Sequence, residues 1–249
     1  MSTRYNPSIV RDSLAFYLDA VNNKSYPGSG TTWKDISGKG NDGTTDSTTF
    51  DSEGFFDFDG TNDNVKIPMT GDVNNTLFNG SNNFTVEFWF KADNLPANGG
   101  SNYKYSQALL GGGNRRCVIV FGDSLDDKEV SIRFRIGGSW TSVGSGADSI
   151  DNNRWYNMIA TYDSSDGFVL YLNGDQKSTS STTGTIETSP SAFDSDNKLI
   201  GCISDNTSDV NFKDRFFDGK ISICRIYNKV LTTTEVQQNY HAFKGRFGL

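Results

Sequence analysis

Glutamate, histidine and cysteine are scarce in this sequence of 249 residues. Only five of its 30 acidic residues are glutamates, so most of the acidity is aspartate, which favours turns over charged helices. Three cysteines make a poor disulfide framework, because the number is odd and Cys117 and Cys224 lie in apolar runs typical of strands. The sequence therefore predicts many loops, few helices and buried free thiols.

Clusters of basic residues and long apolar runs are also missing. The longest basic runs are pairs such as Arg115 and Arg116, and the formal charge is −7. This argues against a nucleic-acid partner, because phosphate binding needs clustered Lys and Arg. No apolar run reaches the length of a membrane span or, at the amino terminus, of a signal peptide. We therefore expect a chain with no membrane contact that is made and folded in a cytosol.

Residues 83–91, with the sequence NFTVEFWFK, form the clearest alternating segment. The residues on one side of an extended strand are Phe84, Val86, Phe88 and Phe90. The residues on the other side are Thr85, Glu87, Trp89 and Lys91. This pattern predicts a strand with its phenylalanine face in a core and its other face outward.

Further segments of strand composition recur at short spacing. They span residues 14–20, 55–59, 64–68, 108–110, 116–121, 130–136, 155–162, 168–173, 175–180, 198–203 and 220–227. The single helix candidate begins at Thr232, which forms a capping-box pattern with Glu235, and Gly245 is its predicted stop. Together these segments predict an all-β, antiparallel two-sheet sandwich with one short C-terminal helix.

Several stretches, taken in order, resemble the laminin-G and pentraxin jelly-roll domains of the concanavalin A-like superfamily. They read FYLDA, SYPGSGTTWKDISGKGNDGT, FFDFDGTNDNVKIP, FTVEFWFK, RWYNMIATYD, FVLYLNG, KLIG and DGKISICRIYNKVLTTTEV. The resemblance implies a jelly roll that fills residues 13–249 as a single laminin-G-like domain. Residues 1–12 are then an N-terminal arm.

Two stretches are similar to versions of the domain found in tailed bacteriophages. They are SYPGSGTTWKDISGKGNDGT near the amino end and NYHAFKGRFGL at the carboxyl end. The resemblance implies a non-enzymatic virion structural protein, either a capsid decoration or a head or tail fibre component. Its partners are expected to be other virion proteins, its own copies and, by weak adhesion, host-surface glycans. The predicted attachment residues, in the arm, are Tyr5, Asn6, Pro7 and Ile9.

A glycan-cleaving enzyme is an alternative of a different class. Glycoside hydrolysis needs two carboxylates at a defined separation, and enzymes of the resembled fold carry a Glu-x-Asp-x-x-Glu pattern that does not occur here. Glu87 has Trp89 where a second carboxylate would stand, and the only histidine is His241 in the predicted helix. We therefore expect no catalytic residues, and interpret Glu87 as an outward charge and His241 as a helix-surface residue.

Calcium is the cofactor that the resemblance implies. In pentraxins an Asp-Asn pair before a strand binds calcium, and Asp63 and Asn64 match that pair. Asp205 matches a family aspartate, whereas Ile203 stands where the family has a glutamate ligand. Two interpretations stay open: one weakly held calcium ion at Asp63, Asn64 and Asp205, and aspartates that only cap turns.

Carbohydrate binding without cleavage is the remaining alternative, beside an oligomeric structural domain. A lectin-like site needs exposed aromatic rings for stacking on pyranoses and polar groups for the hydroxyls. Tyr103, Tyr105 and Trp140 lie in or beside predicted loops and are the candidate glycan-binding residues.

Overall fold

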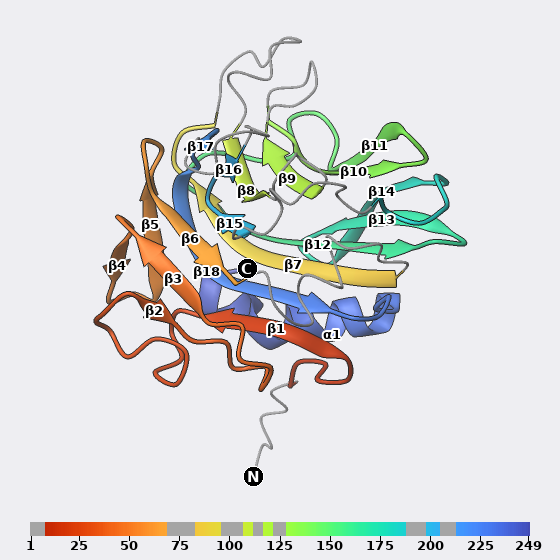
Figure 1. Ribbon diagram of the computed structural model, residues 1–249. Coiled ribbons are helices and arrows are strands. Elements are labelled where there is room, and N and C mark those ends of the chain that lie inside the picture. Colours follow the sequence, from red (N-terminus) through yellow and green to blue (C-terminus); the bar gives the residue numbers. More distant parts are fainter. Residues whose placement is uncertain are drawn as a thin grey trace.

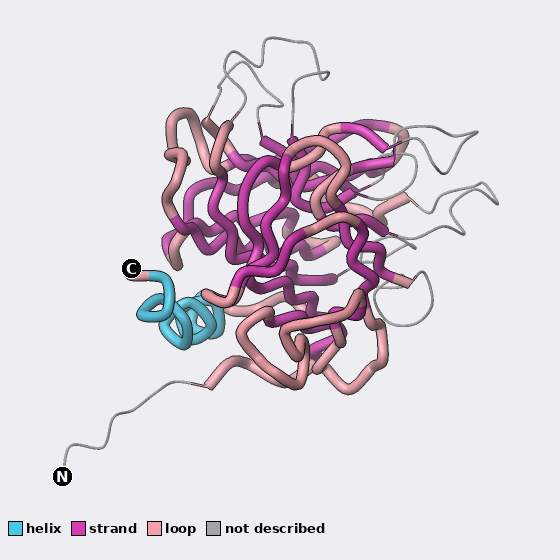
Figure 2. Tube along the Cα trace, turned by 90° about the vertical axis from the view of Figure 1, so that its left-hand side faces the viewer, coloured by secondary structure: helices cyan, strands magenta, loops and turns pink. Residues whose placement is uncertain are grey.

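A computed structural model describes residues 8–68, 83–95, 107–111, 117–121, 128–187, 198–204 and 213–249. These residues form two antiparallel sheets packed face to face, with one α-helix outside the first sheet (Figures 1 and 2). The predicted all-β sandwich with a short C-terminal helix is confirmed. None of the helices in the described part of the chain is long and apolar enough to cross a membrane.

The first sheet has eight strands and is centred on β7 (Asn83–Ala92) and β18 (Asp218–Tyr227). Its order is β14-β13-β12-β7-β18-β5-β4, and β1 pairs with β18 as well. The other strands are β1 (Leu14–Asp19), β4 (Thr49–Asp51), β5 (Phe55–Asp59), β12 (Trp155–Asp163), β13 (Gly167–Leu172) and β14 (Asp175–Ser180). The strand with the clearest alternation in the sequence thus lies in the middle of the sheet.

The second sheet also has eight strands, in the order β11-β10-β9-β8-β15-β6-β3-β2. They are β2 (Thr32–Trp33), β3 (Gly43–Asp46), β6 (Asn64–Ile67), β8 (Gln107–Gly111), β9 (Cys117–Phe121), β10 (Val130–Ile136), β11 (Ser139–Gly144) and β15 (Lys198–Ile200). A small third sheet pairs β16 (Ile203–Ser204) with β17 (Lys213–Asp214).

The inner core lies between the two large sheets. Phe84 and Phe90 of β7 have no exposed surface, and their rings reach across to the second sheet. The centroid of Phe84 lies 5.0 Å from that of Phe134, and the centroid of Phe90 lies 5.2 Å from that of Phe121. Burial of each such side chain stabilises the fold by about 2 kcal/mol. The inward face predicted for β7 is therefore confirmed.

The outer face of the first sheet is covered as well. Helix α1 (Thr233–Phe243) and the 3-10 helix η5 (Lys244–Phe247) lie against it (Figure 2). Glu87 and Trp89 on this face have no exposed surface. The prediction that they point outward to solvent is wrong, because the C-terminal segment folds back over the centre of the sheet.

Two local sequence signals correctly predict the start of helix α1 and the turn after β13. The Thr232 hydroxyl accepts a hydrogen bond from the Glu235 N–H while the Glu235 carboxylate accepts one from the Thr232 N–H, which is the predicted capping box. Asn173 and Gly174 have φ of 53° and 80°, as a primed hairpin turn requires. Helix α1 ends at Phe243 with Lys244 as its C-cap, so it stops just before Gly245 as predicted, and the chain continues as η5.

Five short strands escape prediction from the sequence, β2, β3, β4, β11 and β17, and β16 overlaps the predicted segment 198–203 only at Ile203. They are two to six residues long and mostly polar. Pairing with neighbouring strands defines them, and no alternating apolar pattern marks them.

The described end of the predicted arm packs on the body of the domain. Ile9 and Val10 are each 7% exposed and join the apolar cluster beneath α1. The Val10 N–H donates to Asn239 Oδ1 at 2.9 Å, and the Tyr227 hydroxyl donates to the Val10 carbonyl at 3.1 Å. The fold therefore begins before Asp12, while residues 1–7 lie outside the described residues.

Candidate functional site

The β10–β11 hairpin presents a tryptophan to solvent. Its two-residue turn, Gly137-Gly138, has φ of 57° and 84°, a conformation that glycine adopts without strain. In the resulting register Trp140 pairs with Arg135, and the exposed Ser142 pairs with Arg133. Directly paired residues share one face of a sheet, so all four lie on the outer face.

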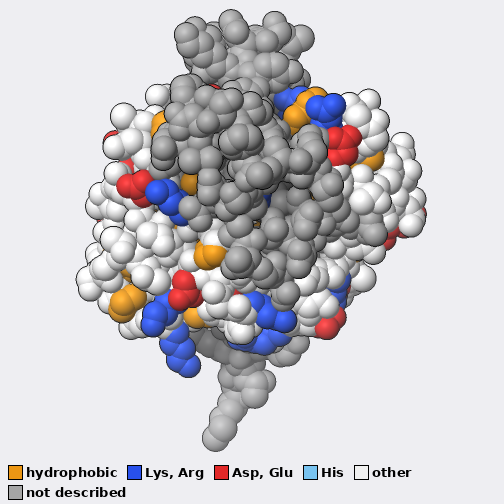
Figure 3. All heavy atoms as spheres, viewed as in Figure 1, with side chains coloured by type: hydrophobic (Ala, Val, Ile, Leu, Met, Phe, Trp, Pro, Cys, Tyr) orange, Lys and Arg blue, Asp and Glu red, His pale blue; other side chains and the backbone are white. Residues whose placement is uncertain are grey.

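This group, together with Glu187, is called the Trp140 surface below. The indole of Trp140 is 41% exposed. The Arg133 guanidinium carbon lies 5.4 Å from the indole centroid, and Arg135 Nε lies 3.2 Å from Glu187 Oε2. Figure 3 shows basic, apolar and acidic side chains gathered over the hairpin, at the upper right. An exposed aromatic ring is thus bordered by charged hydrogen-bonding groups.

Of the three predicted glycan-binding residues, the structure describes one. Tyr103 and Tyr105 lie outside the described residues. Trp140 is exposed, but it stands on a strand and not in a loop. The Gly137-Gly138 pair directly after the alternating segment of β10 is the sequence signal that could have identified this strand.

Asp63 and Asn64, the predicted calcium pair, close the loop between β5 and β6. The Asp63 carboxylate accepts a hydrogen bond from the Asp59 N–H at 2.9 Å. The Asn64 amide donates to the Asn62 carbonyl at 3.0 Å and to Asp46 Oδ2 at 3.4 Å. Among the described residues, the buried Asn64 Oδ1 has no hydrogen-bond partner.

The electrostatics of this loop fit a cation in part. Burial raises the pKa of Asp63, and the neighbouring carboxylates of Asp59, Asp57 and Asp46 raise it further. A cation would relieve this repulsion, and the oxygen of Asn64 is a suitable hard ligand. The described residues contain no group of three His, Cys, Asp or Glu that could hold a metal, and the third predicted ligand, Asp205, lies outside them.

Glu87 belongs to a buried polar network under α1. One carboxylate oxygen accepts hydrogen bonds from Trp89 Nε1 at 3.0 Å and from Asn157 Nδ2 at 3.1 Å. The other accepts from Arg225 Nη1 at 2.9 Å and from Asn239 Nδ2 at 3.0 Å. The interpretation of Glu87 as an outward charge is wrong; its carboxylate is instead fully engaged inside the protein.

Of the remaining predicted residues, some lie outside the described residues and others are placed by the structure. Tyr5, Asn6 and Pro7 lie outside the described residues, so attachment through them stays a prediction. Ile9 packs beneath α1, so little of its side chain is accessible to a partner. His241 is exposed on α1, as predicted.

Known structures of the same fold include proteins solved with sugars. The ligand binding domain of botulinum neurotoxin serotype D in complex with N-acetylneuraminic acid is 14% identical, with a TM-score of 0.65. The match covers 93% of this chain and 51% of the neurotoxin chain. Trypanosoma rangeli sialidase in complex with sialic acid is 15% identical, with a TM-score of 0.61 and coverages of 94% and 33%. The receptor binding domain of botulinum neurotoxin type G is 18% identical, with a TM-score of 0.60 and coverages of 92% and 51%.

These likenesses establish the fold alone, since the identities are low and the chain spans about half or less of each of these structures. No curated protein sequence matches the chain. The family model of the concanavalin A-like lectin/glucanases superfamily, in its laminin-G form, matches residues 59–237. Because that segment is well over half of the chain, the protein belongs to the concanavalin A-like lectin/glucanase superfamily as a laminin-G-type domain.

Proposed function

We propose that this protein is a non-catalytic glycan-binding domain and that the Trp140 surface is its binding site. The observation that carries the proposal is the exposure of Trp140. Among the described residues, Trp140 and Val21 are the only exposed large apolar side chains, at 41% and 42%. A large ring left in water beside polar groups is typical of a ligand site.

The chemistry of the Trp140 surface suits a sugar. The apolar face of a pyranose can pack on the indole, which buries area without the need for a deep cavity. The Arg133 and Arg135 guanidiniums and the Ser142 hydroxyl can donate to sugar hydroxyls, and Glu187 can accept from them. The sugar complexes of the neurotoxin and sialidase structures support the same class of ligand.

We expect Trp140→Ala to weaken glycan binding at least tenfold, the loss of about 1.4 kcal/mol or more, because the stacking platform is removed. A glycan array followed by calorimetric titration of the tightest ligand measures this. Val21→Ala, which changes the other exposed apolar residue, is the matched control and should bind like the parent. Equal binding by Trp140→Ala and the parent would contradict the proposed site, and release of reducing sugar would contradict a non-catalytic role.

We propose that the domain is non-catalytic because of the position of Glu87. Its carboxylate is bonded to Arg225, Asn157, Asn239 and Trp89 and has no exposed surface. A general acid or nucleophile must reach the glycosidic bond. This carboxylate cannot do so while α1 covers it.

Calcium binding at Asp63 and Asn64 is the second part of the proposal. The raised pKa of Asp63 and the unpaired Asn64 oxygen support it. Asp63→Asn should raise the melting temperature by about 2 °C at pH 7 in calcium-free buffer, because it removes a buried charge from among other carboxylates. Since the folded state has the higher pKa, protonation relieves the same penalty as the pH falls through that pKa. The difference between the two proteins should therefore shrink from pH 7 to pH 4.

The same melting experiment tests the ion. Millimolar calcium should stabilise the parent protein and leave Asp63→Asn unchanged. Asp175→Asn, at an exposed position on β14, is the matched control and should respond to calcium like the parent. If calcium stabilises neither the parent nor the control, or stabilises Asp63→Asn equally, the aspartates of this loop only cap turns.

Display on a phage particle rests on the resemblance of the sequence to phage versions of the domain. In that setting the glycan-binding surface would serve adhesion to a host, and the segment before Ser8 would serve attachment. Antibody labelling of purified particles by electron microscopy tests the location. Label on heads or tails supports it, and unlabelled particles with protein left in the lysate contradict it.

A further inference from the structure

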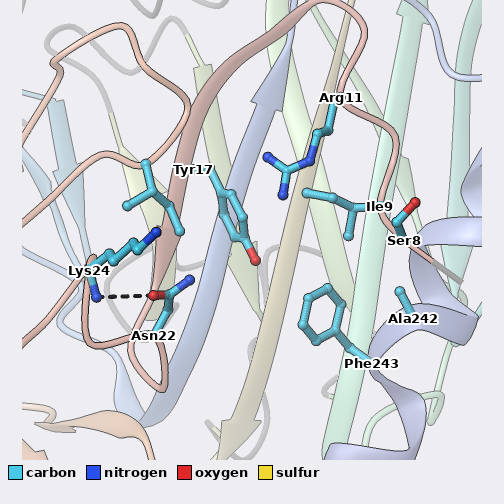
Figure 4. Close-up of a pocket in the computed structure, with 9 residues that line it drawn as sticks. Ser8, Ile9, Arg11, Tyr17, Asn22, Lys24, Ala242 and Phe243 are labelled. Atoms are coloured by element: carbon cyan, nitrogen blue, oxygen red, sulfur yellow. Dashed lines mark hydrogen bonds between the residues drawn. The ribbon is translucent and has the colours of Figure 1, made fainter. Parts of the chain in front are cut away.

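A cavity lies where the entry segment of the described chain meets helix α1. Its volume is about 400 Å³, which is the size of a small-ligand site. Side chains from the entry segment, β1, the loop after β1 and the helix line it, among them Ile9, Arg11, Tyr17, Lys24 and Phe243. Figure 4 shows Arg11 and Lys24 approaching Tyr17 from opposite sides, with Phe243 rising from α1 below.

The charge of this cavity is positive in a protein of net charge −7. Arg11 and Lys24 are exposed, and no described residue forms an ion pair with either. The nearby carboxylates have other partners: Asp12 pairs with Lys229 at 3.0 Å, and Asp19 pairs with Arg246 at 2.8 Å. Two cations therefore face the cavity from its two sides without a neutralising partner among the described residues, and their charge favours an anionic ligand.

A second guanidinium, that of Arg225, lies behind the cavity wall. The carbon of the fully buried Arg225 guanidinium lies 4.6 Å from the centroid of Tyr17 and 4.5 Å from that of Phe243, and both rings line the cavity. Arg225 donates to Glu87 through Nη1, whereas Nε and Nη2 have no hydrogen-bond partner among the described residues. Because Arg225 is ion-paired with Glu87, it adds no net charge, and the positive charge that a ligand meets is that of Arg11 and Lys24.

The rest of the lining suits the body of an organic ligand and not a bare ion. Ile9, Ile36, Ala242 and Phe243 supply apolar contacts. Asn22 Oδ1 accepts a hydrogen bond from the backbone N–H of Lys24 at 3.0 Å (Figure 4). The amide nitrogen of Asn22 can then donate to a ligand. A ring-sized body can therefore lie on the apolar wall while its charged group lies in the positive field of Arg11 and Lys24.

We propose that this cavity binds a small carboxylate-bearing molecule of monosaccharide size, drawn by the positive charge of Arg11 and Lys24 on its two sides and held by Phe243 and Asn22 through its body. This site is formed by other residues than the Trp140 surface and goes beyond the function proposed for that surface. The ligand class follows from two cations that no described residue neutralises, one amide donor and an apolar wall in a cavity of about 400 Å³.

The test uses the full chain carrying Trp140→Ala, so that binding at the Trp140 surface does not contribute. Glucuronate and glucose are the probes, because the first carries the carboxylate that the second lacks, and inorganic phosphate is the probe for an anion without a ring body. Ligand-observed NMR titration gives each Kd. We expect glucuronate to bind at least tenfold more tightly than glucose and than phosphate.

Charge-removing variants then assign the site. Arg11→Gln and Lys24→Gln together should weaken glucuronate binding at least tenfold, Lys24→Arg should preserve it, and Lys177→Gln on the exposed β14 should leave it unchanged. Because no described residue forms an ion pair with Arg11 or Lys24, the melting temperature of the double variant should match that of the parent. Equal affinity for glucose or phosphate, or undiminished glucuronate binding by the double variant, would overturn the proposal.

Discussion

Glu87→Gln is expected to lower the free energy of unfolding by about 3–5 kcal/mol, the usual cost of removing one partner from a buried ion pair. Glu87 and Arg225 have no exposed surface, and their charged groups meet at 2.9 Å. Burial opposes the charge on Arg225, yet Glu87, together with Tyr17, Tyr227 and Asp19, outweighs burial and raises the pKa of the guanidinium. Loss of the carboxylate charge therefore leaves a cation buried without its counter-charge. Urea denaturation measures the change.

The double variant Glu87→Gln with Arg225→Met separates charge from packing. Removing both charges leaves no unpaired ion, so the double variant should be more stable than Glu87→Gln alone. Lys66→Ala is the control for an exposed pair, because Lys66 and Asp46 are 3.8 Å apart with side chains 40% and 45% exposed. Its effect should stay below about 1 kcal/mol. A loss of similarly small size for Glu87→Gln would contradict a dry, enclosed network.

Trp89→Ala is expected to cost about 3–5 kcal/mol, because a fully buried indole is replaced by a cavity. The Trp89 ring stacks on Phe247 at a centroid distance of 4.4 Å and on Tyr240 at 5.9 Å. Its Nε1 also donates to Glu87, so the substitution affects both the helix contact and the polar network. We therefore expect faster amide hydrogen exchange in η5 as well as a lower midpoint in urea.

Trp140→Ala is the matched control for Trp89→Ala, since it makes the same substitution at an exposed site. Its effect on the free energy of unfolding should stay within about 0.5 kcal/mol. If Trp89→Ala were equally mild and left hydrogen exchange in η5 unchanged, the C-terminal segment would not be held by this stack.

Much of the sandwich can be predicted from local patterns. The phenylalanines of β7 alternate because one face meets the second sheet, and a period of two survives in the sequence wherever a face is buried. The capping box at Thr232 and the Asn173-Gly174 turn are equally local, since each needs only residues within one turn.

The other face of β7 could not be predicted, because its cover comes from the far end of the chain. Glu87 is a buried ion-pair residue only when Arg225 pairs beside it and Asn239 packs above it, about 140 and 150 residues later in the sequence. Glutamate between threonine and tryptophan is ordinary on a solvated strand. Nothing within the strand itself distinguishes the two environments.

The Trp140 surface could be predicted only in part, because its residues also come together only in the folded chain. Trp140 is recognisable as a tryptophan in a polar stretch, but its neighbours Arg133 and Arg135 become neighbours only through the hairpin register. The Arg11 and Lys24 cavity has no sequence signal at all. Its walls come from the two ends of the chain, which the fold brings together.

The most direct test of glycan binding at Trp140 is a titration followed through the four tryptophan indole N–H signals by NMR. Trp33 and Trp89 are fully buried and Trp155 is partly buried, so the signal lost in Trp140→Ala identifies the exposed indole. With the tightest glycan from the array, we predict that the Trp140 signal shifts in a saturable way while the Trp33 and Trp89 signals stay in place. Saturable binding that leaves the Trp140 signal unmoved would contradict the proposed site.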